Sequence, residues 1–415
     1  MLLDMTVANF KSVKSPQTIS FEAIKDNRFP ESKVVKVNDK LKLIKTAAIV
    51  GPNGAGKSTF VRALEVLKGI VLATEETENP LLILSGTSFA YSEEKGVPAT
   101  IIIRVLIDRG DATQEATIAQ YTLVADREKI FEESLFYILG RSKKLMFERK
   151  LDEACLLLDD VKLTYKYRWG KMYRGEKKRL VNKVDEKHSY LSAATSKGSE
   201  TTTPLYNWIN ESLHLLPMGV SNISEKYLIT QLTEHPDWVQ QLINFLWSVD
   251  ITDIRDIRIK DDRVIFIHTN VTQHYASFFT AESLSLRRLC LMGVAFFESF
   301  IKSRTLIIDD FGMLLHPDVL SHVVEIFEAS NTGYGSQMLA VDCNPSLLKP
   351  GLMRRDGIYF AEKNSESATV YFSLANFKYS KSKDRTQNQY MSGAFGALPI
   401  LSEFCFVDAN KDKEV

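Results

Sequence analysis

Cysteine is scarce in this chain, and long apolar runs are missing altogether. Four cysteines occur among 415 residues, widely separated and without a Cys-x-x-Cys pair, which argues against a disulfide framework and against a zinc site. No apolar stretch approaches the length of a membrane-spanning helix, and the first residues lack the pattern of a signal peptide. We therefore expect a soluble cytoplasmic protein without a membrane partner.

Net charge is also lacking, because 52 lysines and arginines balance 52 aspartates and glutamates. Global charge therefore argues neither for nor against a nucleic-acid partner, and only local patches can indicate one. The composition, 45% hydrophobic and 25% charged, is that of a globular protein with room for one large domain or two ordinary ones.

A phosphate-binding loop is predicted where Gly-x-x-x-x-Gly-Lys-Ser follows the apolar run 46–50 and precedes a helical pattern. Its glycines let the backbone aim successive N–H groups at phosphate oxygens, and the helix directs its positive dipole end at the same anion. We expect Lys57 to reach the β- and γ-phosphates of ATP and Ser58 to bind Mg²⁺. The predicted nucleotide-binding residues of this loop are Asn53, Gly54, Ala55, Gly56, Lys57, Ser58 and Thr59.

A second motif lies at 305–310, where the strand-like run Thr-Leu-Ile-Ile ends in two carboxylates. Alone, such a run also fits a strand-capping turn, but an upstream phosphate loop in the same chain favours a catalytic pair. Asp309 is expected near Mg²⁺, and Asp310 is expected to orient or activate water. The predicted catalytic residues are therefore Lys57, Asp309 and Asp310, and the predicted metal ligands are Ser58 and Asp309.

Periodicity outside the motifs predicts a mixed α/β chain. Residues 2–9 and 16–22 have the pattern of short strands, and three alternating segments between residues 99 and 137 suggest an antiparallel meander. The apolar spacing over 188–249 is helical. The Ser- and Thr-rich segment 194–204 is predicted to be a mobile link.

The run 162–187 is basic, with aromatic residues interleaved. Such a strip fits a surface that follows a DNA backbone while its rings stack on bases. The alternative is a solvated hairpin face whose cations pair with acidic neighbours. The sequence leaves both interpretations open.

About 250 residues separate the phosphate loop from the carboxylate strand, which implies a large insertion. With these motifs the chain resembles the ABC-type ATPases of the SMC, RecF and OLD group. The closer likeness is to the stand-alone ATPases of bacterial anti-phage systems (OLD-like and RloC-like). The resemblance runs through Asn-Phe-Lys-Ser at 9–12, Glu-Ser-Leu-Ser-Leu-Arg-Arg-Leu at 282–289, the carboxylate pair, His-Pro at 316–317, and the tail patterns at 353–360 and 390–399.

The resemblance implies an α/β fold: an ABC/SMC-head-like P-loop domain with an antiparallel β subdomain and an inserted, mainly helical subdomain. The corresponding boundaries are 1–150, 151–250 and 251–415. It also implies that two copies pair head-to-tail, with ATP between the phosphate loop of one and the helix after Ser283 of the other. Lys11 and Ser12 are implied to lie beside the nucleotide, and His316 is expected to open a helix with Pro317.

The chain departs from the family pattern in three places. Ser285 replaces the signature glycine and Leu286 the threonine after it, Asp310 replaces the usual catalytic glutamate, and Cys343 stands in place of the switch histidine. A shorter carboxylate displaces a water-positioning oxygen by about 1 Å, which costs roughly a hundredfold in rate. We therefore expect slow turnover, with ATP binding as the event that sets the state of the protein.

Three functions compete at this point. The first is a regulatory ATPase of an anti-phage system that controls a separate effector protein, favoured because the sequence shows no nuclease motif. The second is a RecF- or SMC-like ATPase of DNA maintenance, which would use the 162–187 strip. The third, an ATPase subunit of a transporter, fits the large insertion and the irregular signature least well.

Overall fold

The computed structural model describes residues 1–25, 31–91, 97–110, 115–152, 154, 163–216, 224–270, 273–331, 335–377 and 385–403. A central sheet has the order β11-β15-β16-β5-β17-β18 and is parallel except for β18. Its middle strands are buried on both faces, which explains their nearly continuous apolar sequences. The strands are β5 (Thr46–Val50), β11 (Leu213–Leu216), β15 (Thr305–Asp309), β16 (Gln337–Asp342), β17 (Ile358–Lys363) and β18 (Thr369–Ser373).

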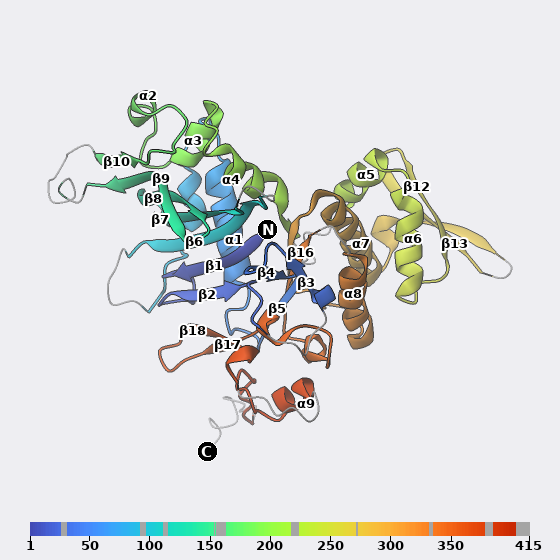
Figure 1. Ribbon diagram of the computed structural model, residues 1–415. Coiled ribbons are helices and arrows are strands. Elements are labelled where there is room, and N and C mark those ends of the chain that lie inside the picture. The colour runs from blue at the N-terminus through green and yellow to red at the C-terminus, as the bar shows by residue number, and fades with distance from the viewer. Residues whose placement is uncertain are drawn as a thin grey trace, which may run out of the picture.

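Alternate residues of the central strands face two different cores. Ala47 and Ile49 of β5 pack with α1 and the antiparallel sheet, whereas Ala48 and Val50 pack with α7 and α8. The central sheet is thus covered on both faces, as Figure 1 shows. These helices are α1 (Thr59–Leu72), α7 (Leu284–Lys302) and α8 (Pro317–Ser330).

A seven-stranded antiparallel sheet of order β10-β9-β8-β7-β6-β1-β2 packs on α1. It confirms the two predicted N-terminal strands and the predicted meander, and it adds two strands beyond residue 140. Its strands are β1 (Leu2–Ala8), β2 (Gln17–Ser20), β6 (Ala99–Asp108), β7 (Thr117–Ala125), β8 (Ile130–Leu139), β9 (Ser142–Leu151) and β10 (Tyr165–Trp169).

A third unit packs on the outer side of α7 (Figure 1). Helix α6 approaches α7 closely at Gly293, where an added Cβ would lie 2.9 Å from side-chain atoms of Leu242 and Phe245. The unit consists of α5 (Glu225–Glu234), α6 (Trp238–Ser248) and the sheet of β12 (Ile254–Lys260), β13 (Arg263–Thr269) and β14 (His274–Phe278). The remaining elements are β3 (Val34–Lys36), β4 (Lys42–Ile44), α2 (Lys178–Val181), α3 (Tyr190–Ser196), α4 (Thr203–Asn207) and α9 (Thr386–Met391), with short 3-10 turns and one π turn.

The α/β fold class is confirmed, and the described residues of 188–249 are mainly helical as predicted. Within the described part of 151–250, residues before β11 share the core of α1, and those after it share the core of α7. The boundaries at 150 and 250 stay a prediction. No helix among the described residues is both long and apolar enough to span a membrane.

The prediction of a mobile link at 194–204 is wrong. Ser199 and Thr202 are fully buried, and their side chains are hydrogen-bonded. Ser199 Oγ donates to Arg174 O over 2.8 Å, and Thr195 Oγ1 lies 2.8 Å from Thr202 Oγ1. The hydroxyl groups of this segment are satisfied inside the fold, by a backbone carbonyl and by one another.

Candidate nucleotide-binding site

The phosphate loop connects β5 to α1 at the carboxyl edge of the central sheet. Gly54 and Gly56 have φ angles of 77° and 94°, a region that favours glycine. A Cβ at Gly56 would also overlap the side chains of Thr369 and Ser12. Among the described residues, no protein group accepts a hydrogen bond from the N–H groups of Gly54, Gly56, Lys57 or Ser58. These four backbone N–H groups lie within five residues of the chain and are free to bind an anion together.

Ser58 and Asp309 are in contact although 251 positions separate them in the sequence. Ser58 Oγ donates to Asp309 Oδ1 over 3.0 Å, which joins the start of α1 to the end of β15. Asp309 Oδ1 also accepts the N–H of Asp310 over 3.1 Å. The two predicted metal ligands therefore lie together at one edge of the sheet.

Lys57 bends back over its own loop. Its Nζ donates to Pro52 O over 3.0 Å, and the residue is buried. The Pro52 carbonyl therefore holds the lysine head against the loop. Exchanging this single carbonyl for phosphate oxygens would strengthen the contact, because an anion is a better partner for the ammonium.

Negative charge is concentrated around Asp309. Burial raises the pKa of its carboxyl group, and the hydrogen bond from Ser58 opposes this, while Asp310 and Glu65 raise the pKa further. No group of three or more His, Cys, Asp or Glu that could hold a metal occurs among the described residues. A cation at Asp309 would therefore need oxygen ligands from another source, such as phosphate, to complete its shell.

Asp310 has a left-handed backbone with φ of 51° and an exposed side chain. The fully buried guanidinium of Arg288, on α7, donates through Nη2 to the Asp310 carbonyl. Asp342, at the end of β16, accepts the N–H of Gly312 and so fixes the turn that follows. Burial lowers the pKa of Arg288, and the charges of Asp310 and Asp342 counteract this. The sequence prediction missed the supporting role of Asp342, although its position after a buried strand was a signal.

The hairpin strand β18 supports the back of the loop. Thr369 Oγ1 lies 2.7 Å from both Ala55 O and Ser12 Oγ, and Tyr371 OH donates to Gly56 O over 2.6 Å. These contacts hold the loop carbonyls outward, so that the N–H groups point the other way. Neither Thr369 nor Tyr371 was predicted, because no local pattern distinguishes them from ordinary strand residues.

Ser12 is in the site, whereas Lys11 is beside it. Ser12 Oγ lies 3.2 Å from Thr59 Oγ1, at the first residue of α1. Lys11 is exposed with φ of 51°, and its backbone N–H donates to Thr87 O. The predicted contact of the Lys11 side chain with nucleotide stays a prediction.

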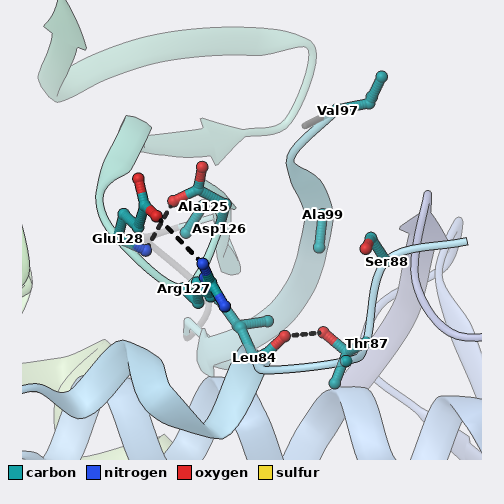
Figure 2. A pocket seen from close by; sticks show the side chains of 10 residues that line it. Leu84, Thr87, Ser88, Val97, Ala99, Ala125, Asp126, Arg127 and Glu128 are labelled. Carbon is teal, nitrogen blue, oxygen red and sulfur yellow. Dashed lines mark hydrogen bonds and ion pairs between the residues drawn. The ribbon is translucent and has the colours of Figure 1, made fainter. Parts of the chain in front are cut away.

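Figure 2 shows the residues around a cavity of about 350 Å³, two of which bond to the 9–12 segment. Thr87 lines it and accepts from Lys11, and Val97 lines it and accepts from the side chain of Asn9. None of its lining residues belongs to the phosphate loop. They are Leu84, Gly86, Thr87, Ser88, Val97, Ala99, Ala125, Asp126, Arg127 and Glu128.

Ser283 caps α7 and does not share in the Ser58–Asp309 contacts. Its exposed side chain accepts the N–H of Leu286 over 3.2 Å. Ser285 Oγ donates to Leu314 O over 2.8 Å, which joins the first turn of α7 to the segment after Asp310. The role predicted for His316 is confirmed, since it caps α8 with Pro317 at the first position.

The described part of the basic strip, 163–187, matches the solvated-hairpin interpretation more closely than a stacking surface. Lys166 and Arg168 are exposed and pair with Asp152 and Glu148 over 2.9 and 3.1 Å. The rings on the other side of β10 pack inward: Tyr167 stacks on Trp169, and Trp169 Nε1 donates to Tyr190 OH. Lys162 lies outside the described residues.

No protein-family model and no curated protein matches this chain. Solved SMC head domains are similar to it in structure, over 90% of its length. The head of the SMC protein from Thermotoga maritima aligns over 98% of that chain at 12% identity and a TM-score of 0.42. An SMC head bound to the winged-helix domain of ScpA aligns over 97% of that chain, at 12% identity and a TM-score of 0.49. A Pyrococcus furiosus SMC head bound to the C-terminal domain of ScpA aligns over 96% of that chain, at 10% identity and a TM-score of 0.44. At these TM-scores, the assignment of the site rests on its own geometry.

Proposed function

We propose that this chain binds ATP with Mg²⁺ at the 51–59 loop and hydrolyses it slowly. The observation that carries the proposal is the contact between Ser58 and Asp309 next to four free N–H groups of the loop. A hydroxyl and a carboxylate in this arrangement are the two protein ligands that a P-loop supplies to Mg²⁺. The bound ion would neutralise phosphate charge, and Lys57 would bind the terminal phosphates.

Asp310 is the candidate for orienting the attacking water. Its side chain is exposed at the edge of the site, and Arg288 holds its carbonyl from behind. The carboxylate is one methylene shorter than the glutamate of the family it resembles, and its backbone is fixed in the left-handed region. Because the backbone has little freedom to compensate for the missing length, we infer slow turnover, with ATP binding as the regulating event.

We further infer that ATP joins two copies of the chain head-to-tail and thereby controls a separate effector of an anti-phage system. The support is that Ser283 presents an exposed hydroxyl at a helix start and takes no part in the chain's own Ser58–Asp309 contact. Helix starts bind anions through unpaired N–H groups. A second copy is the simplest source of the phosphate that this position would contact.

The alternative function is a DNA-binding ATPase of repair or maintenance. One observation favours it: Lys177, Lys178 and Arg179 form an exposed basic group. The aromatic residues of the same strip are packed inward, so contact with DNA would be through phosphates alone. A salt-dependent DNA complex that disappears when these three cations are neutralised would support this function.

The proposed function is tested by ATP binding and turnover of the purified chain. The wild type should bind ATP with Mg²⁺ and turn it over slowly, and Asp309→Asn should lose the Mg²⁺-dependent part of the affinity. Lys40→Ala, a change of an exposed lysine outside the site, serves as the matched control. Wild-type protein that is folded but ignores millimolar ATP, or that turns over tens of ATP per second, would contradict the proposal.

A further inference from the structure

A buried histidine lies between two carboxylates in the sheet next to α7. His268, on β13, has only 4% of its surface exposed. Its Nδ1 lies 2.7 Å from Asp253 Oδ2, and its Nε2 lies 3.0 Å from Glu282 Oε1. Ser277 Oγ is 3.0 Å from the same Nε2 and also contacts Glu282 Oε1. Tyr275 stacks on the imidazole with a centroid distance of 4.5 Å.

The number of available donors determines how these groups pair. A carboxylate only accepts hydrogen bonds, and a neutral imidazole has a single N–H to give. Both carboxylate contacts of His268 are satisfied together when both ring nitrogens carry hydrogen, with the Ser277 hydroxyl donating to Glu282. In that arrangement one ring nitrogen holds Glu282 and the other is held by Asp253.

Glu282 occupies a sensitive position, because it immediately precedes Ser283, the N-cap of α7. A carboxylate released at this point would compete for the free N–H groups of the helix start. It would also repel any phosphate that approaches them. Bound to His268 and Ser277, its negative charge is directed into the three-stranded sheet instead, and its side chain is only 14% exposed.

We propose that His268 is a positioning residue that holds Glu282 and thereby keeps the start of α7 open for the phosphate of ATP bound to a second copy. The inference rests on the proposed head-to-tail pairing of two copies. It identifies the residue that keeps the start of α7 accessible to the ATP of the other copy. The same helix continues into Ser285 and Arg288, which contact Leu314 O and Asp310 O. Its placement therefore also bears on the chain's own catalytic edge.

The distances within Asp253, His268 and Ser277 also match those of a hydrolase triad. The second carboxylate opposes that activity, because Glu282 is bound to the same Ser277 oxygen and would repel a developing oxyanion. Labelling by a fluorophosphonate probe distinguishes the two. Labelling of the wild type that Ser277→Ala abolishes would overturn the positioning role in favour of hydrolysis.

The decisive experiment measures ATP-dependent dimerisation by sedimentation, with ATP binding by dilute monomer measured separately. His268→Gln should weaken dimerisation roughly tenfold, because the single amide nitrogen of Gln can hold only one of the two carboxylates and leaves Glu282 free to turn towards the helix start. ATP binding by the monomer should be unchanged, because the contacts of His268 are with Asp253, Ser277, Glu282 and Tyr275 and not with the loop. Adding Glu282→Gln to His268→Gln should restore dimerisation, because the repelling charge is gone. His274→Gln, on the exposed neighbouring strand, is the control. If His268→Gln does not fold, Asp253→Asn replaces it in the experiment, because the Asp253 side chain is 57% exposed and the change is mild. This variant should weaken dimerisation less than tenfold.

The failures are distinguishable. Normal dimerisation of folded His268→Gln, or a double variant that is not rescued, overturns the role of His268 but leaves ATP binding and pairing intact. Wild-type protein that binds ATP and stays monomeric overturns the proposed pairing itself, and the role of His268 with it.

Discussion

The phosphate loop before α1 and the start of α7 are the two helix starts to which we assign phosphate contacts, and they are built differently. The loop is held from behind by side chains of two other segments, through Ser12, Thr369 and Tyr371. The start of α7 has its cap, Ser283, exposed, and the neighbouring carboxylate of Glu282 is in contact with His268 and Ser277. The first helix start contacts Asp309, the second of the two proposed metal ligands, within the same chain. The phosphate that we assign to the second helix start comes from another copy. The difference supports a model in which the first binds nucleotide alone and the second only contacts nucleotide carried by another copy.

The largest expected effect is on ATP affinity, from a change in the phosphate loop alone. Lys57→Ala should lower ATP affinity by about a hundredfold, because the lysine is the principal cation at the terminal phosphates. The melting temperature should stay near that of the wild type, because the side chain makes one hydrogen bond, to Pro52 O. Calorimetric titration and thermal melting measure both quantities. A collapse of the melting temperature would show that the lysine is a structural residue.

Ser283→Ala tests the other side of the comparison. Monomer affinity for ATP should remain that of the wild type, while ATP-dependent dimerisation should weaken several-fold through loss of the hydroxyl contact. Ser303→Ala, at the opposite end of α7, is the matched control. Loss of monomer affinity for ATP in Ser283→Ala would place this serine in the chain's own nucleotide site. The start of α7 would then not be a separate contact for the nucleotide of another copy.

Thr369→Val removes the hydroxyl that supports the loop and leaves the shape of the side chain. We expect a loss of about 1 kcal/mol in the free energy of unfolding and a several-fold loss in ATP affinity, because Ala55 O loses its partner. Thr18→Val, on the exposed strand β2, controls for the change of side chain. Unchanged affinity would mean that the loop keeps its shape without β18.

A smaller effect is expected from pH in the absence of nucleotide. The pKa of Asp309 is raised in the folded protein, so the folded state binds more protons than the unfolded state above the ordinary pKa of an aspartate. Ionised Asp309 therefore destabilises the nucleotide-free protein near neutral pH, and this cost disappears below the unfolded pKa. Asp309→Asn should stabilise the protein at pH 7 and give no gain near pH 3, as measured by urea unfolding. A gain of equal size at both pH values would rule out ionisation as the cause.

The smallest effect is expected from the basic strip. Replacing Lys177, Lys178 and Arg179 with glutamine should leave ATP binding and dimerisation unchanged, because these side chains are exposed and lie outside the Ser58–Asp309 contact. DNA binding by gel shift at several salt concentrations measures the remaining possibility. A strong, salt-dependent complex that the triple variant loses would make the DNA-binding alternative the better account.

Sequence predicted what depends on local spacing and missed what depends on tertiary contact. The phosphate loop and the Asp309–Asp310 strand carry their own patterns, and the parallel sheet brings them together as expected. Thr369 and Tyr371 come from a hairpin with no motif. Strand β11 was not predicted, because it lies inside the helical pattern of 188–249 and Leu-His-Leu-Leu fits a helix or a strand. Its parallel pairing with β15 makes it a strand.

The most direct test of the central claim is the affinity for ATP measured with and without Mg²⁺. We predict that the wild type binds at least about tenfold more tightly with Mg²⁺, and that Ser58→Ala and Asp309→Asn bind equally weakly in both conditions. Wild-type affinity that does not respond to Mg²⁺, or variants that retain the response, would contradict the claim that these two residues hold the metal of a bound nucleotide.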